Sequence, residues 1–462
     1  MTERSTDVAV LGAGPAGLGA AYRLAAKGHE VVLLEAASQV GGLAGSVEVA
    51  GMRVDFGSHR LHPSIAPEIL DELNGLDGID LQRRPRHGRI RLAGRWIGFP
   101  LAVRDALAHL PPRLSAGLVR DAVLAPLRFA RTDTFEAVLR AGVGPTLAER
   151  FYFPYARKIW GLAPAELSGE QARRRVSANS LVKIALRALR GQRETPWFWY
   201  PTAGFGVISE ALERHARALG ADIRLQHPVI GLERDHDGWT VRTASGAPLS
   251  ARHVWNTLPL PALTGMLTPP PEAELRAAAD GLRYRGMLLI YLALRCDRYT
   301  SFDAHYFPEA WTPVTRISEP KNYRDGPDPS DITVLCAELP CAPDDRWWSA
   351  SDDELAQIVV AACVASDLQP PTPEAVVVHR RRHAYPIATP DSVERLGRLE
   401  RWLAAQPDLV TLGRQGLFAH DNTHHALAMA WAAADALDAD GTFDRQAWAA
   451  ARGRFRSHVV ED

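Results

Sequence analysis

The chain has little of what marks secreted, metal-binding or nucleic-acid-binding proteins. Only four of its 462 residues are cysteine, and none of them form a C-x-x-C pair. Their spacing, also relative to histidine, predicts neither a disulfide framework nor a zinc site, and we expect no metal. The 53 basic and 54 acidic residues leave a formal net charge of −1. No overall field therefore favours nucleic acid or an anionic membrane.

Targeting and membrane signals are also missing from the start of the chain. Met1–Arg4 does not lead into the charged-then-apolar arrangement of a signal peptide. The apolar run that follows is broken by glycines and a proline, which excludes a membrane span there. We therefore expect a cytoplasmic protein that acts on a small molecule. Its length predicts two or three interleaved lobes.

What the sequence does contain is a glycine-rich turn between a predicted strand and a predicted helix. Residues 7–11 are short, apolar and β-branched, as in a buried strand. Residues 12–17 read G-A-G-P-A-G, and residues 18–27 are alanine-rich with high helix propensity. Residues 29–34 predict a second strand. This order of elements is typical of a dinucleotide-binding βαβ unit.

Each glycine of this turn has a physical role. Gly12 permits the tight turn out of the strand, and Gly14 lets a pyrophosphate approach the backbone. Gly17 lets the helix pack closely on the strand, while the helix N-terminus offers free N–H groups to the phosphates. Glu35 ends the second strand, where its carboxylate can accept hydrogen bonds from ribose hydroxyls. This fingerprint alone fits NAD as well as FAD.

A second glycine pair decides between the two cofactors. Glu35 is followed by A-A-S-Q-V and then Gly41-Gly42. This pattern resembles the flavin enzymes of the amine oxidase and protoporphyrinogen oxidase superfamily. The resemblance implies that the glycine pair lets the chain wrap the pyrophosphate, and that the cofactor is FAD.

The segment 54–63 sharpens the resemblance. V-D-F-G-S-H-R-L-H-P is similar to the G-x-H-x-F-H segment of UDP-galactopyranose mutase and to the D-x-G-x-H-R segment of mutase-like oxidoreductases. The resemblance implies that Ser58 and His59 lie along the flavin ring. His59 and His62 are candidate proton donors or acceptors, because imidazole titrates near neutral pH. Their alternative role is that of loop histidines with satisfied hydrogen bonds.

Further blocks of the same resemblance run down most of the chain. They are residues 155–161, 197–206, 315–323, 385–386, 413–414 and 421–422. Together with the segment 54–63, the resemblance implies catalytic roles for His59, His62, Tyr385 and Arg316. It implies further cofactor contacts at Val229, Gly413, Arg414, Asp421 and Asn422. It implies substrate contacts at Trp160, Asn179, Trp199, Tyr200, Arg316, Lys321 and Tyr385.

Three of these features have plainer alternatives. The aromatic cluster 197–200 could be core instead of a stacking pocket. Arg316 could form a surface ion pair instead of binding an anion through its planar fork. The run Arg380-Arg381-Arg382-His383 could be a solvated charge run instead of a phosphate site.

One departure bears on the substrate. The mutases carry R-I-P-x-R, whose last arginine grips the nucleotide diphosphate, whereas this chain has Arg175-Val-Ser-Ala-Asn179. Near the C-terminus it also has His420-Asp421-Asn422 in place of their Y-x-Y-x-D segment. Both differences argue against a UDP-sugar.

The resemblance predicts an α/β fold. A Rossmann-like FAD-binding domain of the glutathione-reductase type would be interleaved with a helical cap and a mixed-sheet substrate domain. The FAD-binding domain would comprise residues 1–80, 200–262 and 405–440, the cap 85–195, and the substrate domain 280–390. Helices are expected over 102–110, 115–131 and 170–190, with Pro126 kinking or splitting the second. Strands are expected over 229–235, 239–243 and 286–294. The final helix, 424–436, would point its N-terminus at the flavin.

Three functions fit these patterns. The first is an FAD-dependent oxidoreductase that takes a hydride from a C–H bond beside oxygen or nitrogen of a sugar-containing or secondary-metabolite substrate. The second is a non-redox pyranose/furanose isomerase of the UDP-galactopyranose mutase type, with N5 of reduced FAD as nucleophile. The third is a flavin-binding partner protein without turnover. The oligomeric state is left open.

Overall fold

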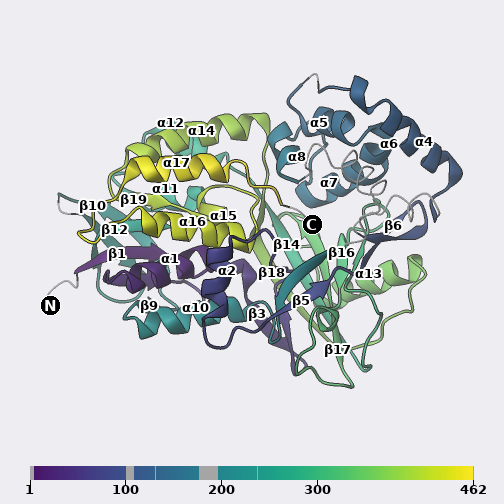
Figure 1. Cartoon of the computed structure of the whole chain (residues 1–462), viewed down its shortest axis with the longest axis horizontal. Coiled ribbons are helices and arrows are strands. Elements are labelled where there is room, and N and C mark those ends of the chain that lie inside the picture. Colours follow the sequence, from purple (N-terminus) through teal and green to yellow (C-terminus); the bar gives the residue numbers. More distant parts are fainter. Residues whose placement is uncertain (1–4, 100–108, 131, 176–195, 237, 461–462) are drawn as a thin grey trace.

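The computed structural model describes residues 5–99, 109–130, 132–175, 196–236 and 238–460. Within these ranges the chain forms a mixed α/β fold with two large sheets and a separate group of helices (Figure 1). The first sheet and its helices fill one end of the molecule, and the second sheet and the helical group fill the other.

The first sheet is built on the glycine-rich turn. β1 (Ser5–Leu11) leads through α1 (Pro15–Ala26) into β2 (Val31–Leu34), and the two strands pair in parallel. Both strands are buried on nearly every position, as expected for a parallel sheet covered on both faces. The strand order is β13-β10-β11-β12-β1-β2-β9, with β19 also paired to β12. The added strands are β9 (Asp222–Arg224), β10 (Val229–Arg234), β11 (Trp239–Thr243), β12 (Leu249–Asn256), β13 (Leu267–Thr268) and β19 (Leu409–Thr411).

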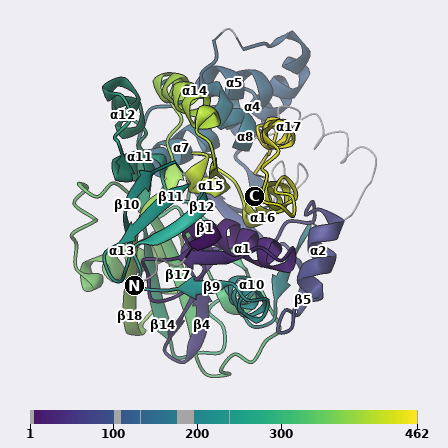
Figure 2. The same ribbon diagram turned by 90° about the vertical axis from the view of Figure 1, so that its left-hand side faces the viewer.

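Helices cover both faces of this sheet. On one face α1 packs between α10 (Val207–Ala218) and α16 (Thr423–Asp435) (Figure 2). Helices α1 and α16 pack closely because α1 has a glycine at the contact. A Cβ on Gly19 would lie 2.7 Å from the ring of Trp431. The opposite face packs against α11 (Leu260–Met266), α12 (Ala273–Asp280) and α14 (Pro390–Ala405).

The second sheet is mixed and has the order β18-β14-β17-β16-β15-β6-β7. Its centre is β14, which is antiparallel to both neighbours and buried at nine of its eleven positions. β15 and β6 pair in parallel, and α13 (Asp352–Ala365) packs on β14 and β18. The strands are β6 (Gly88–Leu92), β7 (Arg95–Phe99), β14 (Tyr284–Leu294), β15 (Ala304–Tyr306), β16 (Arg316–Ser318), β17 (Thr333–Cys341) and β18 (Pro373–Pro386).

Two short ribbons complete the sheets. One pairs β3 (Ser46–Val49) with β4 (Met52–Asp55), and the other pairs β5 (Leu81–Pro85) with β8 (Trp197–Pro201). The segment that follows β4 therefore starts between the two large sheets, since β4 also packs against β17. This places residues 56–62 between the nucleotide unit and the mixed sheet.

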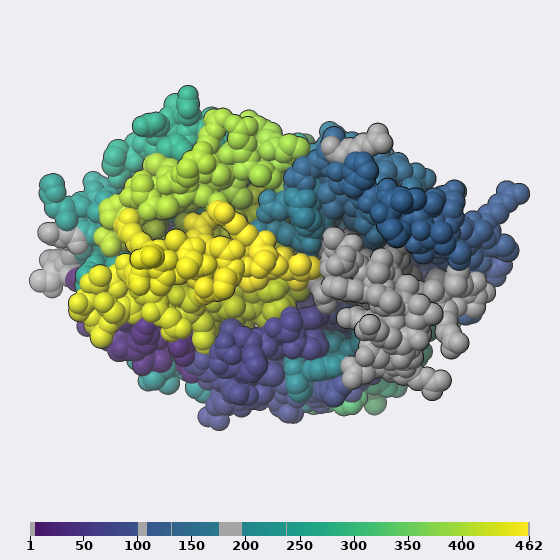
Figure 3. All heavy atoms as spheres, turned by 45° about the horizontal axis from the view of Figure 1, so that its top comes forward, coloured from purple at the N-terminus to yellow at the C-terminus, as the bar shows by residue number. Residues whose placement is uncertain are grey.

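The helical group contains α4 (Pro112–Val123), α5 (Phe135–Gly142), α7 (Phe153–Trp160) and α8 (Gly169–Arg175). In the space-filling view its residues, drawn mostly in blue, lie at one end of the molecule (Figure 3). The helix expected over 115–131 ends at Val123, and Pro126 lies in a 3₁₀ turn after it. Proline lacks the N–H that would continue an α-helix, which explains the early end. The predicted helix 102–110 and the second half of the predicted helix 170–190 lie outside the described residues. Among the described helices, none is long and apolar enough to cross a membrane.

Candidate functional site

The glycine-rich turn leaves room beside the N-terminus of α1. Gly12 has φ +98°, and a Cβ on Gly17 would lie 1.9 Å from the carbonyl oxygen of Gly12. At Gly14, by contrast, an added Cβ would meet nothing within 4 Å. The first turn of α1 has no side-chain cap, so its N–H groups face this open space. The arrangement suits a pyrophosphate at the helix N-terminus.

Glu35 lies at the edge of the same space. Its carboxylate accepts hydrogen bonds from the N–H of Ala13 (2.7 Å) and the N–H of Ala37 (2.8 Å). These two bonds fix the side chain and leave lone pairs of the carboxylate for a ribose. The backbone of β10 begins next to it, because the N–H of His227 donates to the carbonyl of Glu35 at 2.8 Å. Val229 opens β10, and its predicted contact with adenine stays a prediction.

The second glycine pair folds back on the first turn. Gly41 and Gly42 have φ +108° and +56°, a region that favours glycine. The N–H of Gly41 donates to the carbonyl of Ala13 (2.8 Å), and a Cβ on Gly42 would lie 3.2 Å from Cα of Gly14. Gly413, with φ +77°, packs against Ala16 on another side of the helix start. All five predicted glycines of the turn and the pair thus meet at one place: Gly12, Gly14, Gly17, Gly41 and Gly42.

Asp55 anchors the segment that leads to the predicted flavin end. Its buried carboxylate accepts hydrogen bonds from the Ser46 hydroxyl (2.7 Å), the Phe205 N–H (3.0 Å) and the Tyr200 hydroxyl. Tyr200 is fully buried, and burial raises the pKa of its phenol well above the usual value. The hydroxyl of Tyr200 therefore helps to hold Asp55 within the core, and the substrate contact expected of Tyr200 stays a prediction.

Ser58 and His59 follow directly. The Ser58 N–H donates to Glu338 at 2.9 Å, and its hydroxyl hydrogen-bonds Tyr323. His59 stacks on Phe205 with ring centroids 5.2 Å apart, and its Nε2 lies 3.0 Å from the carbonyl of Phe56. A carbonyl only accepts, so Nε2 carries the proton and Nδ1 keeps its lone pair. Burial lowers the pKa of His59, which leaves the ring neutral and able to accept a proton.

His62 faces a different surface from His59. Its Nδ1 lies 2.7 Å from the Ser64 hydroxyl, and its ring stacks on His424 in the first turn of α16 at 5.8 Å between centroids. The two candidate histidines are therefore close in sequence but contact different elements. The catalytic role expected of each stays a prediction.

Arg316 is held in a buried ion pair. Its Nη2 lies 2.6 and 2.8 Å from the two carboxylate oxygens of Glu338, and its Nε lies 3.0 Å from the first of them. The guanidinium also lies over the ring of Tyr306. The plainer alternative for Arg316, an ion pair, is what the side chain forms, although the pair is buried and not at the surface. Its planar fork is occupied by a carboxylate of the protein itself.

Lys321 is likewise turned toward the protein. Its ammonium donates to the carboxylate of Asp297 (2.8 Å) and to main-chain carbonyls of Asp297 (2.9 Å), Pro329 and Ile332 (3.2 Å). An ammonium has three protons to donate, so the four acceptors use its whole capacity. The side chain ties together Asp297, Pro329 and Ile332, and the substrate contact expected of Lys321 stays a prediction.

The remaining predicted residues form an aromatic group. Tyr385 on β18 stacks on His420 at 4.9 Å, and the edge of Trp160 at the end of α7 meets the same imidazole at 6.5 Å. Arg414 lies over Tyr385 at 5.2 Å and donates to the carbonyl of Asp421 at 3.2 Å. Residues from the helical group, the mixed sheet and the C-terminal segment thus converge here. Asn422 is the N-cap of α16, next to this group.

Two other predicted substrate residues are elsewhere. Trp199 pairs with Leu61 through two main-chain hydrogen bonds of 2.9 and 3.1 Å, which joins the 56–62 segment to β8. Asn179 lies outside the described residues, so its predicted contact stays a prediction.

Arg381 is a candidate cofactor residue that the sequence did not distinguish from the other members of the basic run 380–383. It is only partly exposed, with its guanidinium 3.7 Å from the ring centroid of Phe56, which itself packs on Gly45. No described side chain or carbonyl forms a hydrogen bond or ion pair with it, and burial lowers the pKa of its guanidinium. Arg380 donates to the carbonyls of Trp348 and Ala350, while Arg382 is exposed. Only strand alternation on β18, which puts neighbours on opposite faces, could have singled out Arg381.

We predict that Arg381 binds the phosphates of the cofactor. Replacing it, Arg381→Leu, should weaken FAD binding by on the order of 10- to 100-fold, the worth of one charge-assisted hydrogen bond of about 1.5–3 kcal/mol. The measurement is the dissociation constant of FAD for apoprotein, followed by quenching of flavin fluorescence. Arg382→Leu, one residue away on the exposed face, is the matched control. Equal affinities of the two variants would show that Arg381 does not meet the cofactor.

The sheet order, the glycine turn with its carboxylate, and the second glycine pair together suit a dinucleotide cofactor. Comparisons with known proteins make this specific. The sequence profile described as flavin containing amine oxidoreductase matches residues 15–437, and the chain belongs to this family. It is a flavoenzyme, and its cofactor is FAD.

Several relatives show how far the likeness extends. Coproporphyrinogen III oxidase of Mycobacterium leprae is 28% identical over 327 residues, which is 65% of this chain and 69% of that protein. Further curated relatives are matched over about half of their own length. The crystal structure of reduced UDP-galactopyranose mutase superposes with a TM-score of 0.83 at 22% identity, over 98% of this chain and 100% of that one. Putrescine oxidase bound to putrescine superposes with a TM-score of 0.66 at 18% identity, over 93% and 98%. At these identities the two structures show a shared fold.

Proposed function

We propose that this flavoenzyme oxidises a small molecule by removing a hydride from a C–H bond that neighbours oxygen or nitrogen. The substrate would be a sugar-containing or secondary-metabolite alcohol or amine. One observation carries the proposal above all. Arg316, the residue expected to grip a substrate diphosphate, is already bound on two of its nitrogens by the buried carboxylate of Glu338.

The internal partners of Arg316 and Lys321 bear on the choice between oxidation and sugar isomerisation. A sugar–nucleotide isomerase must hold a diphosphate leaving group, which needs cations with open hydrogen-bonding edges. Arg316 and Lys321 both direct their donors to internal acceptors. Freeing Arg316 would leave Glu338 as an uncompensated buried charge. An oxidation of an alcohol or amine needs no such grip.

Within this proposal each part of the site has a task. Bound FAD supplies the two-electron acceptor that takes the hydride. His59, with a free lone pair on Nδ1, accepts the proton from the O–H or N–H of the substrate, so the product is a C=O or C=N compound. Tyr385, Trp160 and His420 offer flat surfaces to the apolar part of the substrate.

The alternative is the non-redox isomerase that acts with reduced flavin. Its support is the shared fold with UDP-galactopyranose mutase. Trp160 would then contact the leaving group, and Arg316 would have to exchange Glu338 for phosphate. The third hypothesis, a flavin-binding protein without turnover, is less well supported because the family consists of flavoenzymes.

A dye-coupled screen tests the proposal. Purified holoenzyme is mixed with panels of alcohols, amines and glycosides and with an artificial electron acceptor, whose reduction is followed by absorbance. We expect turnover with at least one class, and a slower rate when the reacting C–H is deuterated. His59→Gln should lower kcat by about 10²–10⁴-fold, the usual contribution of a general base. If no substrate class leads to reduction of the dye, and UDP-galactose is turned over after dithionite treatment, the isomerase is favoured.

A further inference from the structure

The N-terminus of α16 and the last turns of the chain bring together three potential metal ligands. Oδ1 of Asp421 lies 3.5 Å from Nδ1 of His425 and 3.6 Å from Nδ1 of His458. One donor atom from each residue lies within 4.8 Å of the other two. The two histidine rings stack with centroids 4.1 Å apart and 13° between planes. The sequence did not predict a metal site from these three residues, because they span 38 positions and do not follow a short metal-binding spacing.

The distances suit an ion better than direct hydrogen bonds. Protein hydrogen bonds between nitrogen and oxygen have lengths of about 2.7–3.2 Å, shorter than both separations. Two donors that each lie about 2.0–2.1 Å from one ion in tetrahedral geometry are roughly 3.4 Å apart. The observed spacing therefore matches donors that share a centre.

The carboxylate of Asp421 is the second and independent observation. Its side chain is fully buried, and neither oxygen has a hydrogen-bond partner among the described residues. Buried carboxylates without partners are costly and call for a counterion. Arg174 comes only to 3.9 Å and is held by Glu170 at 2.9 Å, so it gives charge but no hydrogen bond.

A hydrogen bond shows which ring nitrogen of His425 carries no proton. The N–H of Asn422 donates to Nδ1 of His425 at 3.2 Å, so this nitrogen is the unprotonated one, and a bound ion would take the place of that hydrogen bond. His458 is held in place by the main chain, because the N–H of Val460 donates to the carbonyl of Arg174 at 2.7 Å.

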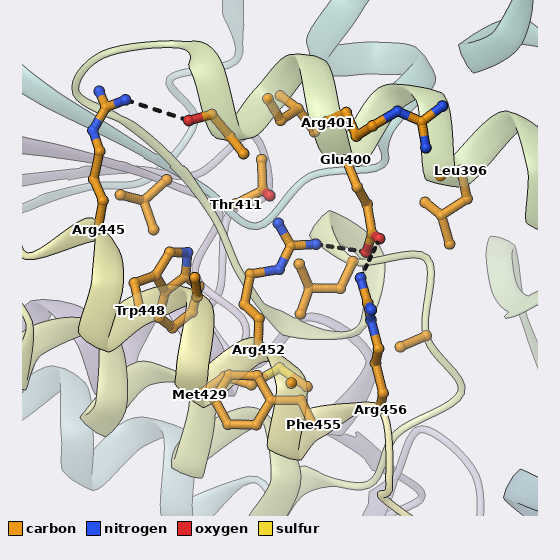
Figure 4. A pocket seen from close by; sticks show the side chains of 18 of the residues that line it. Leu396, Glu400, Arg401, Thr411, Met429, Arg445, Trp448, Arg452, Phe455 and Arg456 are labelled. Atoms are coloured by element: carbon orange, nitrogen blue, oxygen red, sulfur yellow. Dashed lines mark hydrogen bonds and ion pairs between the residues drawn. The ribbon is translucent and has the colours of Figure 1, made fainter.

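A cavity reaches one member of this cluster. Asp421 is among the residues that line a cavity of about 760 Å³ between α14 and α17 (Arg445–Phe455), with β19 and α16 at its base. Figure 4 shows Arg452 of α17 and Arg456, which follows this helix, reaching across the cavity to Glu400 of α14, beside an apolar wall that includes Trp448 and Phe455.

We propose that Asp421, His425 and His458 form a binding site for a first-row divalent transition ion such as Zn²⁺. Two imidazoles and one carboxylate suit such ions better than they suit Mg²⁺ or Ca²⁺, which prefer oxygen ligands. The ion satisfies the buried carboxylate and ties the chain end after α17 to the first turn of α16. That turn lies beside the aromatic group of the candidate site, so the ion fixes one wall of it without taking part in the flavin reaction.

Metal content of the FAD-loaded protein tests the proposal. Holoenzyme is treated with EDTA, dialysed, titrated with ZnCl₂ in a calorimeter and analysed by elemental mass spectrometry. We expect one Zn²⁺ per chain, and a melting temperature that rises with Zn²⁺ because the ion binds only the folded state. Of the three ligands, His458 is the farthest in sequence from the predicted flavin contacts. His458→Ala should weaken Zn²⁺ binding by about 10- to 100-fold or more.

Two controls keep the result unambiguous. His236→Ala removes an exposed histidine outside the cluster and should bind Zn²⁺ like the parent protein. The visible flavin spectrum of His458→Ala should stay unchanged, which shows that the fold and the cofactor are intact. Asp421→Asn should also lose the ion. No stoichiometric binding, or equal binding by the His458 and His236 variants, overturns the proposal.

Discussion

Alanine at Gly17 should abolish FAD retention, whereas alanine at Gly14 should weaken it without disturbing the fold. A Cβ at residue 17 would lie 1.9 Å from the carbonyl oxygen of Gly12, so the helix must move away from the strand with or without cofactor. A Cβ at residue 14 meets no protein atom within 4 Å and can only clash with a bound ligand. Overpacking of that kind costs about 1–3 kcal/mol, or roughly 5- to 150-fold in affinity.

The two variants separate the fold from the cofactor. Flavin content is measured from the visible absorbance of purified protein, and stability from thermal unfolding of apoprotein. Gly14→Ala apoprotein should melt like the parent apoprotein, while Gly17→Ala apoprotein should melt at a lower temperature. Gly453→Ala, in open space on α17, should be neutral or slightly stabilising. A Gly14→Ala protein with unchanged FAD affinity would mean that the pyrophosphate does not lie against the turn.

Glu338→Gln should destabilise the protein by about 3–5 kcal/mol, the usual cost of leaving one partner of a buried ion pair uncompensated. Glu338 is almost completely buried and binds both the guanidinium of Arg316 and the N–H of Ser58. Its loss therefore also loosens the segment that carries His59. Chemical denaturation of the FAD-free protein, followed by tryptophan fluorescence, measures the free energy of unfolding.

A similar pair at the surface is the control. Glu374 binds Arg295 through both carboxylate oxygens at 2.8 and 2.9 Å, but both side chains are exposed. Solvent screens that pair, so Glu374→Gln should leave stability unchanged within error. If the two substitutions have the same effect, the Arg316–Glu338 pair is not the buried clamp that the proposed function relies on.

Much of the fold followed from local patterns. The strand expected over 239–243 is confirmed to the residue, and those over 229–235 and 286–294 within two residues, because alternating or fully apolar runs bounded by glycine and charge have few alternative structures. The final helix over 424–436 is displaced by only one residue at each end. The helix expected over 115–131 ends at Val123, and Pro126, where a kink or split was expected, lies in the 3₁₀ turn that follows.

The site was less predictable, since sequence position does not tell which partner a side chain meets. Arg316 and Glu338 are 22 residues apart on neighbouring strands, and only the register of β16 on β17 brings them together. The same holds for Tyr200 and Asp55, which are 145 residues apart. Arg381 was hidden in a basic run whose other members lie on different surfaces. Residues whose role is set by the backbone, such as Gly12 and Gly17, were predictable because their constraint is local.

Under the proposed function, the oxidised flavin of this enzyme accepts a hydride from a substrate alcohol or amine. The most direct test is to mix oxidised holoenzyme with candidate alcohols, amines and UDP-galactose under strict exclusion of oxygen, and to follow the flavin absorbance. We expect an alcohol or amine to bleach the flavin and to yield one carbonyl or imine product per flavin, while UDP-galactose leaves the spectrum unchanged. If none of these compounds bleaches the flavin, and UDP-galactose forms the furanose once dithionite is added, the proposed oxidation is contradicted.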